Sequence, residues 1–206
     1  MRKLFLILAF MLCGIGVTVT AQNMRSLFMG APDELFPLLT KGNRADCVDY
    51  IEAGMVAGVS NRLGGMCRMK VLSSDYMLLE PSNVSLVQAK LLPSGGDTLI
   101  CVVKSVKAEA AASRVEFYDK DWCRLDADAF YEAPAIVEFF VSPDSAARYV
   151  DKCDIYLVKL SLSPEGNTLV AEFTMPDYMN DDDAALIRPL MRKVVYRWNG
   201  NKFIRE

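Results

Sequence analysis

The chain has no histidine among its 206 residues. Histidine is the side chain whose unperturbed pKa lies closest to neutrality, and it is the commonest metal ligand in proteins. Its absence removes the usual general base beside a serine or cysteine nucleophile. No serine is followed by a lysine three positions later, so a Ser–Lys pair has no sequence support either. We expect neither nucleophilic catalysis nor a bound cofactor.

The chain also lacks an excess of positive charge. It carries 23 lysine and arginine residues against 26 aspartate and glutamate residues, a formal net charge of −3. Proteins that bind nucleic acid through phosphate contacts present a basic face, so nucleic acid is not an expected partner. The composition is 52% apolar and 24% charged, as in globular proteins, and the length suits one domain or two small units.

Cys-x-x-Cys spacing is missing too, although the chain contains six cysteines. Neither a redox motif nor a structural zinc site is therefore supported. Five cysteines follow the N-terminal segment: Cys47, Cys67, Cys101, Cys123 and Cys153. An oxidising compartment would allow some of them to pair, and the odd number leaves at least one unpaired or paired between chains. For most of the five, a buried free thiol that acts as a small apolar side chain is the simplest interpretation.

The N-terminus has the layout of a secretory signal peptide over residues 1–21. A cationic start precedes an apolar run from Leu4 to Val19, and small residues lead to an expected cleavage site after Ala21. Two alternatives have less support, because the run is short for a membrane anchor and the residues before Cys13 lack the small residue of a lipoprotein site. We expect an exported protein of the periplasm or outer surface, with no membrane-spanning segment after cleavage.

Strand signals dominate the rest of the chain. The stretch 86–122 contains runs rich in β-branched residues, two of them joined by a five-residue turn with two glycines, residues 93–97. Two later runs, 156–162 and 168–175, alternate apolar and polar residues with a period of two. Asn199-Gly200 is the preferred pair for a two-residue type I′ hairpin turn. These patterns predict a mainly antiparallel sheet.

Two principal helices are predicted beside this sheet. Asn43 is a suitable N-cap, with Asp46 three residues later in the manner of a capping box, and Gly54 marks the end of the helix. Ser142 and Pro143 start the second helix as N-cap and first-turn proline. The expected fold class is therefore α+β.

The chain divides into a first α+β unit, residues 22–130, and a second, residues 131–206. Each has the order capped helix, hairpin with a proline and glycine turn, spacer, and aromatic strand. This order predicts two duplicated helix-plus-sheet units packed together. Two unrelated hairpins would look much the same, and one continuous domain is the alternative.

Short strings spread over residues 27–125 carry a resemblance to a known family. They are Pro32-Asp33-Glu34-Leu35, Leu38-Leu39-Thr40-Lys41, Arg44, Asp46-Cys47, Asp49-Tyr50, Asn61-Arg62, Gly64-Gly65, Asp75-Tyr76, Lys90-Leu91-Leu92-Pro93, Ile100-Cys101-Val102-Val103, Phe117-Tyr118 and Asp121-Trp122. Together they resemble the domain of unknown function 3256 found in exported proteins of the Bacteroidales. The C-terminal third is less distinctive. The resemblance implies export in a Gram-negative cell, and it brings no assigned activity and no catalytic residue.

Two groups of residues are candidates for binding. Asn61 and Arg62 begin a glycine-containing loop that could face a ligand, although such glycines more often only reverse the chain. The second group is four aromatic residues that could form a platform for a sugar or a peptide: Tyr118, Trp122, Tyr196 and Trp198. Packing of half-buried rings on a sheet is the simpler interpretation of these four.

The densest acidic cluster is Asp177 together with residues 181–183. Asp181 and Asp183 are candidates for a calcium site, because hard cations take several carboxylates, but their spacing matches no EF-hand loop. A solvated loop that caps the following short segment is the simpler interpretation.

Thr98 and Ser145 are candidate O-glycosylation sites. They lie in Asp-Thr-Leu and Asp-Ser-Ala, which fit the Asp-Ser/Thr-apolar pattern used by exported proteins of such bacteria. Ordinary turn and N-cap chemistry explains the same residues.

The function expected from the sequence is that of an exported, non-enzymatic binding protein whose partner is an envelope protein or a glycan. The alternative is a carboxylate-dependent, glycosidase-like hydrolase in the same compartment. That activity needs two acids about 5–10 Å apart, with a raised pKa on one of them.

Overall fold

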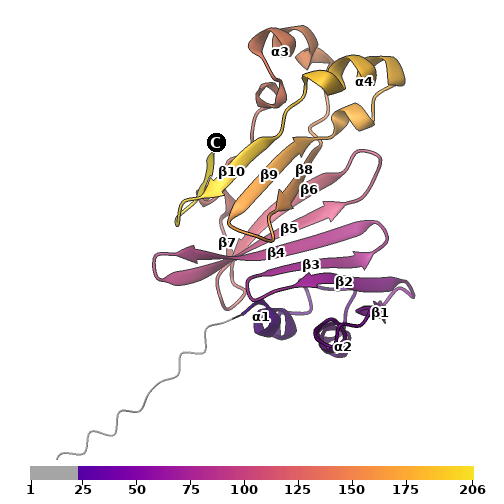
Figure 1. Ribbon diagram of the computed structural model, residues 1–206, viewed down its shortest axis with the longest axis vertical. Coiled ribbons are helices and arrows are strands. Elements are labelled where there is room, and N and C mark those ends of the chain that lie inside the picture. Colours follow the sequence, from indigo (N-terminus) through magenta and orange to yellow (C-terminus); the bar gives the residue numbers. More distant parts are fainter. Residues whose placement is uncertain (1–22) are drawn as a thin grey trace, which may run out of the picture.

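The computed structural model describes residues 23–206 and has an α+β fold, which confirms the predicted fold class. It contains two antiparallel sheets. The smaller sheet packs on one face of the larger, and two helices cover the other face of the larger sheet (Figure 1). The predicted signal peptide lies outside the described residues.

The described part of the chain has four α-helices: α1 (Met24–Gly30), α2 (Lys41–Glu52), α3 (Pro143–Tyr149) and α4 (Asp181–Ile187). The larger sheet follows chain order: β1 (Gly58–Ser60), β2 (Met66–Leu72), β3 (Tyr76–Ser82), β4 (Ser85–Ser94), β5 (Asp97–Val106), β6 (Ala112–Tyr118) and β7 (Arg124–Leu125). The smaller sheet has the order β11-β10-β9-β8: β8 (Val158–Leu162), β9 (Thr168–Phe173), β10 (Val194–Trp198) and β11 (Phe203–Arg205).

The predicted central hairpin is β4–β5, two strands of 10 residues each. Its pairing runs from Ser85↔Val106 to Ser94↔Asp97, so only Gly95 and Gly96 remain as the turn. Their φ angles are 56° and 91°, both positive as a type I′ turn requires. The predicted five-residue turn is therefore wrong in length, because strand pairing continues to the glycines.

Both faces of this hairpin are buried, and each face belongs to a different core. The helix-side core lies between α1, α2 and the larger sheet and includes Val87, Ile100 and Val102. The inter-sheet core lies between the two sheets and includes Cys101 and Val103. Because side chains alternate along a strand, the nearly continuous apolar run of β5 supplies both cores.

The smaller sheet meets the larger one along the edge strand β8. The N–H of Leu160 donates to Ser113 Oγ at 3.0 Å, and the N–H of Leu162 donates to Gln88 Oε1 at 2.8 Å. Strand edges expose unpaired backbone groups that can recruit other chains. Here two side chains of the larger sheet occupy those groups, so hydrogen bonds as well as apolar packing join the sheets.

The helix starts are correct for α3 and wrong for α2. Ser142 caps α3 and Pro143 opens it, as predicted. The N-cap of α2 is Thr40: its hydroxyl accepts from the N–H of Asn43 at 3.0 Å, and Asn43 Oδ1 accepts from the Thr40 N–H at 3.1 Å. Asn43 is thus the third residue of the helix, and Asp46 has no part in the capping box.

The C-terminal hairpin turns one residue later than predicted. The N–H of Asn199 donates to the Lys202 carbonyl at 3.1 Å, so Gly200 and Asn201 form the turn. Only Gly200 of these two has a positive φ, 95°, whereas a type I′ turn needs two. The Asn199 side chain instead accepts from the N–H groups of Asn201 and Lys202.

The two predicted units, 22–130 and 131–206, each contain one sheet. The inter-sheet core draws on both units, as expected if they pack together. The sheets differ in size, with seven and four strands within residues 23–206. Their common feature is a helix followed by a hairpin, and an internal duplication stays a prediction.

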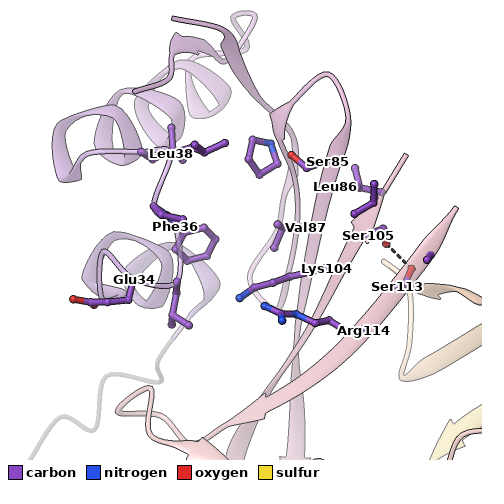
Figure 2. Close-up of a pocket in the computed structure, with 16 residues that line it drawn as sticks. Glu34, Phe36, Leu38, Ser85, Leu86, Val87, Lys104, Ser105, Ser113 and Arg114 are labelled. Atoms are coloured by element: carbon purple, nitrogen blue, oxygen red, sulfur yellow. Dashed lines mark hydrogen bonds between the residues drawn. The ribbon is translucent and has the colours of Figure 1, made fainter. Parts of the chain in front are cut away.

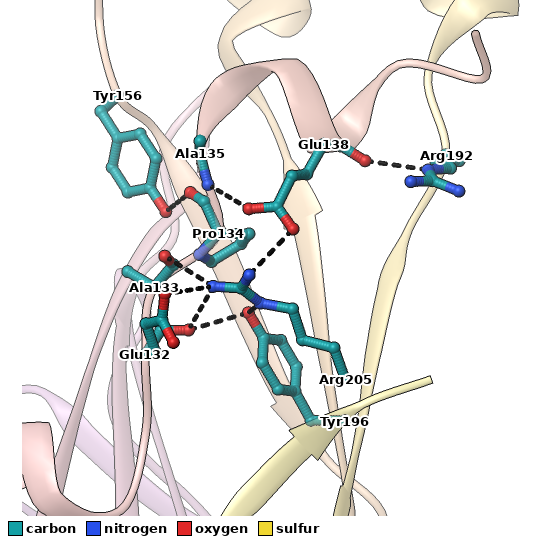
Figure 3. A network of polar contacts seen from close by, with 9 residues as sticks. All are labelled: Glu132, Ala133, Pro134, Ala135, Glu138, Tyr156, Arg192, Tyr196 and Arg205. Atoms are coloured by element: carbon teal, nitrogen blue, oxygen red, sulfur yellow. Dashed lines mark hydrogen bonds and ion pairs between the residues drawn. The ribbon is translucent and has the colours of Figure 1, made fainter. Parts of the chain in front are cut away.

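Arg205 ties β11 to residues 126–141, the segment that leads from the larger sheet to α3 (Figure 3). Its guanidinium donates to the carbonyls of Glu132 and Ala133, at 3.4 and 3.2 Å, and pairs with the Glu138 carboxylate at 3.1 Å. The Tyr196 hydroxyl donates to the Glu132 carbonyl at 3.0 Å. Because this segment has only short 3-10 turns of its own, these bonds fix its path.

We expect Arg205→Met to lower the free energy of unfolding by about 1.5–3 kcal/mol, because several hydrogen bonds from a charged donor are lost together. Arg197→Met is the matched control on the neighbouring strand β10. The Arg197 side chain is 69% exposed and pairs with Glu206 at the surface, so its loss should cost less than about 0.5 kcal/mol. Urea unfolding monitored by tryptophan fluorescence measures both. Equal effects of the two substitutions would contradict the role of Arg205.

Candidate functional site

A groove of about 550 Å³ lies between the chain segment 34–39 and strands β3–β6 (Figure 2). Its apolar lining includes Phe36 and Leu38 from the segment and Val87 from the sheet. Lys104 and Arg114 extend from β5 and β6 toward the segment. We refer to this cavity as the groove and to residues 34–39 as its wall. Its volume is typical of sites that hold a small molecule.

The wall is positioned by a buried arginine of α2. Arg44 is wholly buried and donates through Nη1 to Asp33 Oδ1 at 3.0 Å and through Nη2 to the Ala31 carbonyl at 2.9 Å. A buried cation is tolerated only where such partners are supplied. These contacts fix the turn that leaves α1, and the wall follows directly after it.

Aromatic rings attach the wall to the helix-side core. The Phe36 ring lies edge-on to Phe28 and to Trp122, with centroid distances of 5.1 and 6.4 Å. Trp122 Nε1 donates to the Leu27 carbonyl at 3.1 Å, and its ring packs on Tyr118 at 5.5 Å. Trp122 has a φ of 63°, an uncommon value for a bulky residue, which sharply turns the chain after β6. Trp122 therefore connects α1, the wall and β6.

A charged cluster surrounds Glu116 on β6. Its buried carboxylate lies 2.8 Å from Lys104 Nζ, 3.2 Å from Arg114 Nη2 and 4.0 Å from Arg124 Nη2, and it accepts from the Tyr118 hydroxyl at 2.9 Å. Burial opposes ionisation of Glu116, but hydrogen bonds from Lys104 and Tyr118 and the nearby positive charges outweigh it. The pKa of Glu116 is therefore below its ordinary value of 4.5. Burial and the bond to Glu116 raise the pKa of Tyr118 to about 12.

Lys104 and Arg114 are directly opposite one another in the β5–β6 pairing. Like charges in such a cross-strand pair destabilise a sheet. Glu116 lies on the same face two residues along β6, and its single negative charge faces three cations. Glu34 of the wall also lines the groove, so three cations accompany two carboxylates and positive charge is in excess there. The Lys104 and Arg114 side chains are 22% and 68% exposed, so both are accessible to a ligand.

Asn61 and Arg62, predicted as a ligand-facing loop, shape the chain reversal before β2. Asn61 is buried, its Oδ1 accepts from two backbone N–H groups of the loop at 3.0 and 2.9 Å, and its Nδ2 donates to the Pro81 carbonyl at 3.0 Å. This amide is occupied by the backbone, so simple chain reversal accounts for it. Arg62 is exposed and lies 3.7 Å from Asp33, beside the base of the wall.

The four aromatic candidates do not form a platform, and that prediction is wrong. Tyr118, Tyr196 and Trp198 are only 4%, 1% and 6% exposed. Tyr118 and Trp122 pack with the helix-side core, whereas Tyr196 and Trp198 belong to the inter-sheet core. Their polar ends meet partners inside the protein, as when Trp198 Nε1 donates to the Pro93 carbonyl at 2.7 Å. Buried tyrosine and tryptophan rings generally require such partners.

Residues 181–183 of the acidic cluster form the first turn of α4, where the helix dipole favours negative charge, whereas Asp177 lies in the preceding 3-10 turn and pairs with Arg188. Hydrogen bonds from Lys152 and Asn180 to the Asp183 carboxylate lower its pKa. Across residues 23–206, no three or more histidine, cysteine, aspartate or glutamate side chains are grouped so that they could hold a metal ion, and the Asp183 carboxylate is engaged by Lys152 and Asn180.

The two candidate glycosylation sites differ in accessibility. Ser145 is 8% exposed, and its hydroxyl donates to the Ser142 carbonyl at 2.8 Å, so helix capping accounts for it. Thr98 is half-buried near the exposed turn of the central hairpin and stays a candidate.

Sequence reasoning missed Lys104, Arg114 and Glu116. A lysine inside the apolar run of β5 was the available signal, but its significance depends on strand register. The cluster offers charge for binding rather than an acid for catalysis. Hydrogen bonds from neighbouring lysines lower the pKa of Glu80 and Asp183 as well, whereas a general acid needs a raised pKa.

None of the helices within residues 23–206 is long and apolar enough to cross a membrane. A solved structure, of a domain of an uncharacterized protein from Porphyromonas gingivalis W83, is similar to this chain with a TM-score of 0.77. The two are 25% identical over 88% of this chain and 96% of that one. The comparison with curated proteins gives no match.

The family model described as protein of unknown function (DUF3256) matches residues 16–203. This match covers most of the sequence, including the C-terminal third, and confirms the resemblance carried by the strings between residues 27 and 125. The chain belongs to the DUF3256 family.

Proposed function

We propose that the protein is an exported binding protein of the bacterial envelope and that its groove holds an amphipathic anion. The observation that carries the proposal is the opposed pair of cations, Lys104 and Arg114, beside an apolar groove. In this arrangement the hydrocarbon part of the ligand lies against Phe36, Leu38 and Val87. Its anionic group accepts hydrogen bonds from the two cations.

The charge distribution favours an anion in this place. The opposed cations repel one another, Glu116 offsets only part of their charge, and an entering anion would reduce the repulsion further. Glu116 and Glu34 supply two negative charges for three cations, so positive charge is left for a ligand. Arginine and lysine both form strong charge-assisted hydrogen bonds, and the planar arginine fork suits carboxylate or phosphate.

The apolar walls favour a ligand with a hydrocarbon body. Burial of such a body gains free energy in proportion to the apolar area removed from water, whereas the hydroxyl groups of a glycan would need hydrogen-bond partners. The groove volume of about 550 Å³ suits a single small molecule. The carboxylate-dependent hydrolase receives no comparable support, because the pKa of Glu116 beside the groove is lowered.

Export is the part of the proposal that rests on residues 1–21. The full chain expressed in a Gram-negative host should lose this segment, and N-terminal sequencing of the envelope fraction should begin at Gln22. Ala21→Leu removes the small residue before the predicted cleavage site and should leave the uncleaved precursor. Wild-type protein that keeps Met1 and stays in the cytosol would contradict export.

Decanoate, an amphipathic carboxylate, is a suitable probe of the groove. We expect saturable binding to the wild type by calorimetry, and a loss of about tenfold in affinity for Lys104→Met or Arg114→Met, equivalent to one charge-assisted hydrogen bond. Lys159→Met is the control, because this lysine lies on β8 in the smaller sheet. Uncharged decanol should bind all four proteins with similar affinity. Absence of decanoate binding, or an equal loss in Lys159→Met, would overturn the assignment.

Glu116→Gln should strengthen decanoate binding and weaken the fold, because it removes the carboxylate that competes for Lys104 and Arg114. At neutral pH the free energy of unfolding should fall by about 1–2 kcal/mol. The expected loss is no larger because Arg114 is exposed and solvent screens its attraction to Glu116. The pKa of Glu116 in the folded protein is below its ordinary value. Its stabilising contribution is therefore fully present at pH values above the ordinary pKa, and it is lost as the pH falls through the lowered pKa.

The stability difference between wild type and Glu116→Gln should therefore shrink below about pH 4. Urea unfolding at a series of pH values measures it, with Glu165→Gln in the exposed β8–β9 turn as the control. A difference that stays constant on acidification would count against an ionised Glu116.

A further inference from the structure

Two cysteines meet where α2 packs on the larger sheet. Cys47 on α2 and Cys67 on β2 are wholly buried members of the helix-side core, α2 packs directly on β2, and the two thiols lie close enough for each to shift the pKa of the other. The other described cysteines lie elsewhere. Cys101 and Cys153 belong to the inter-sheet core, and Cys123 is exposed after β6.

We propose that Cys47 and Cys67 form a disulfide bond when the exported protein meets an oxidising compartment. Both are thiols in the structure. The bond would join the middle of α2 to β2, two elements that already pack against one another. Disulfides are stable in exported proteins, where no reducing pool competes.

The oxidation requires an oxidant, here a disulfide compound such as glutathione disulfide or an oxidised thiol–disulfide oxidoreductase. The thiolate of Cys47 attacks the oxidant and releases its first sulfur as a thiol. Cys67 then loses its proton and attacks the mixed disulfide, forming the Cys47–Cys67 bond and releasing the second thiol. Two protons and two electrons leave the protein, and the oxidant is reduced to two thiols.

The surroundings of the two thiols set the order of attack. Interaction with Cys67 lowers the pKa of the Cys47 thiol, which increases its thiolate fraction, whereas interaction with Cys47 and burial raise the pKa of Cys67. The charge of Asp119 raises the pKa of the exposed Cys123 thiol, and burial raises the pKa of Cys101 and Cys153. Because Cys47 and Cys67 are buried, exchange takes place before α2 docks or during its local opening.

The disulfide would also fix the wall of the groove. α2 carries Arg44, which holds Asp33 and Ala31 at the start of the wall. A covalent link between α2 and β2 opposes the local opening that would move Arg44 away from the sheet. This consequence concerns the same groove, but the disulfide itself does not depend on which ligand the groove takes.

The experiment uses purified protein incubated with glutathione disulfide, so it does not depend on export. After acid quenching and denaturation, mass spectrometry should show that the oxidised protein is about 2 Da lighter than the reduced protein. After alkylation, the oxidised protein should carry two fewer alkylated thiols than the reduced protein. Tryptic mapping should recover a joined pair of peptides that contain Cys47 and Cys67. The oxidised protein should also unfold at a higher urea concentration than the reduced one.

Substitutions to alanine provide the controls. Cys47→Ala and Cys67→Ala should each abolish the joined peptide and the shift in urea midpoint between oxidised and reduced samples. Cys153→Ala, also a buried cysteine, should keep both. The wild-type peptide map alone decides the case if a variant fails to fold. A full set of free thiols after oxidation, a lasting glutathione adduct on Cys47, or a joined pair that involves another cysteine would overturn the proposal.

Discussion

The larger sheet is buried on both faces along its central hairpin, and the rest of the structure depends on this constraint. Every residue of β4 from 87 to 92 is buried, so each polar side chain among them must find partners inside the protein. Lys90 pairs with Asp75 at 2.7 Å and donates to the Pro164 carbonyl at 3.0 Å. Gln88 accepts from the backbone of β8. Two polar residues of one strand therefore set the position of the β8–β9 hairpin.

The same alternation of side chains produces the charged groove on the opposite face. Along that face of β5 the residues are Ile100, Val102 and Lys104. The first two belong to the helix-side core, whereas Lys104 lines the groove. The sheet is apolar where the N-terminal segments cover it closely and cationic where only the wall approaches. The groove therefore lies where the helix-side core ends, and the residue pattern of β5 determines the position of both the core and the groove.

Local signals were sufficient for the start of α3 and for the existence of the hairpins, because Ser142 with Pro143 and turn glycines act within a few residues, but they misplaced two of the turns themselves. They were insufficient for the site. Two capping residues in one stretch, Thr40 and Asn43, left the start of α2 ambiguous. The burial of Tyr118 depends on what packs against its face of the sheet, which composition does not reveal. The opposition of Lys104 and Arg114 depends on register, and a shift of one residue would put one of them on the other face.

The shape of the groove depends on one buried cation whose own energetics are unfavourable. Within the described chain, Arg44 Nε is the buried side-chain nitrogen that has no hydrogen-bond partner, and such a group costs stability. A well-packed apolar side chain at this position could give a more stable protein. Unlike an apolar side chain, the arginine forms directional hydrogen bonds, because its guanidinium binds Asp33 and Ala31 at once. Arg62 approaches Asp33 from the solvent side. Since the wall follows this turn directly, the residue whose burial costs stability is also the one that positions the wall against the sheet.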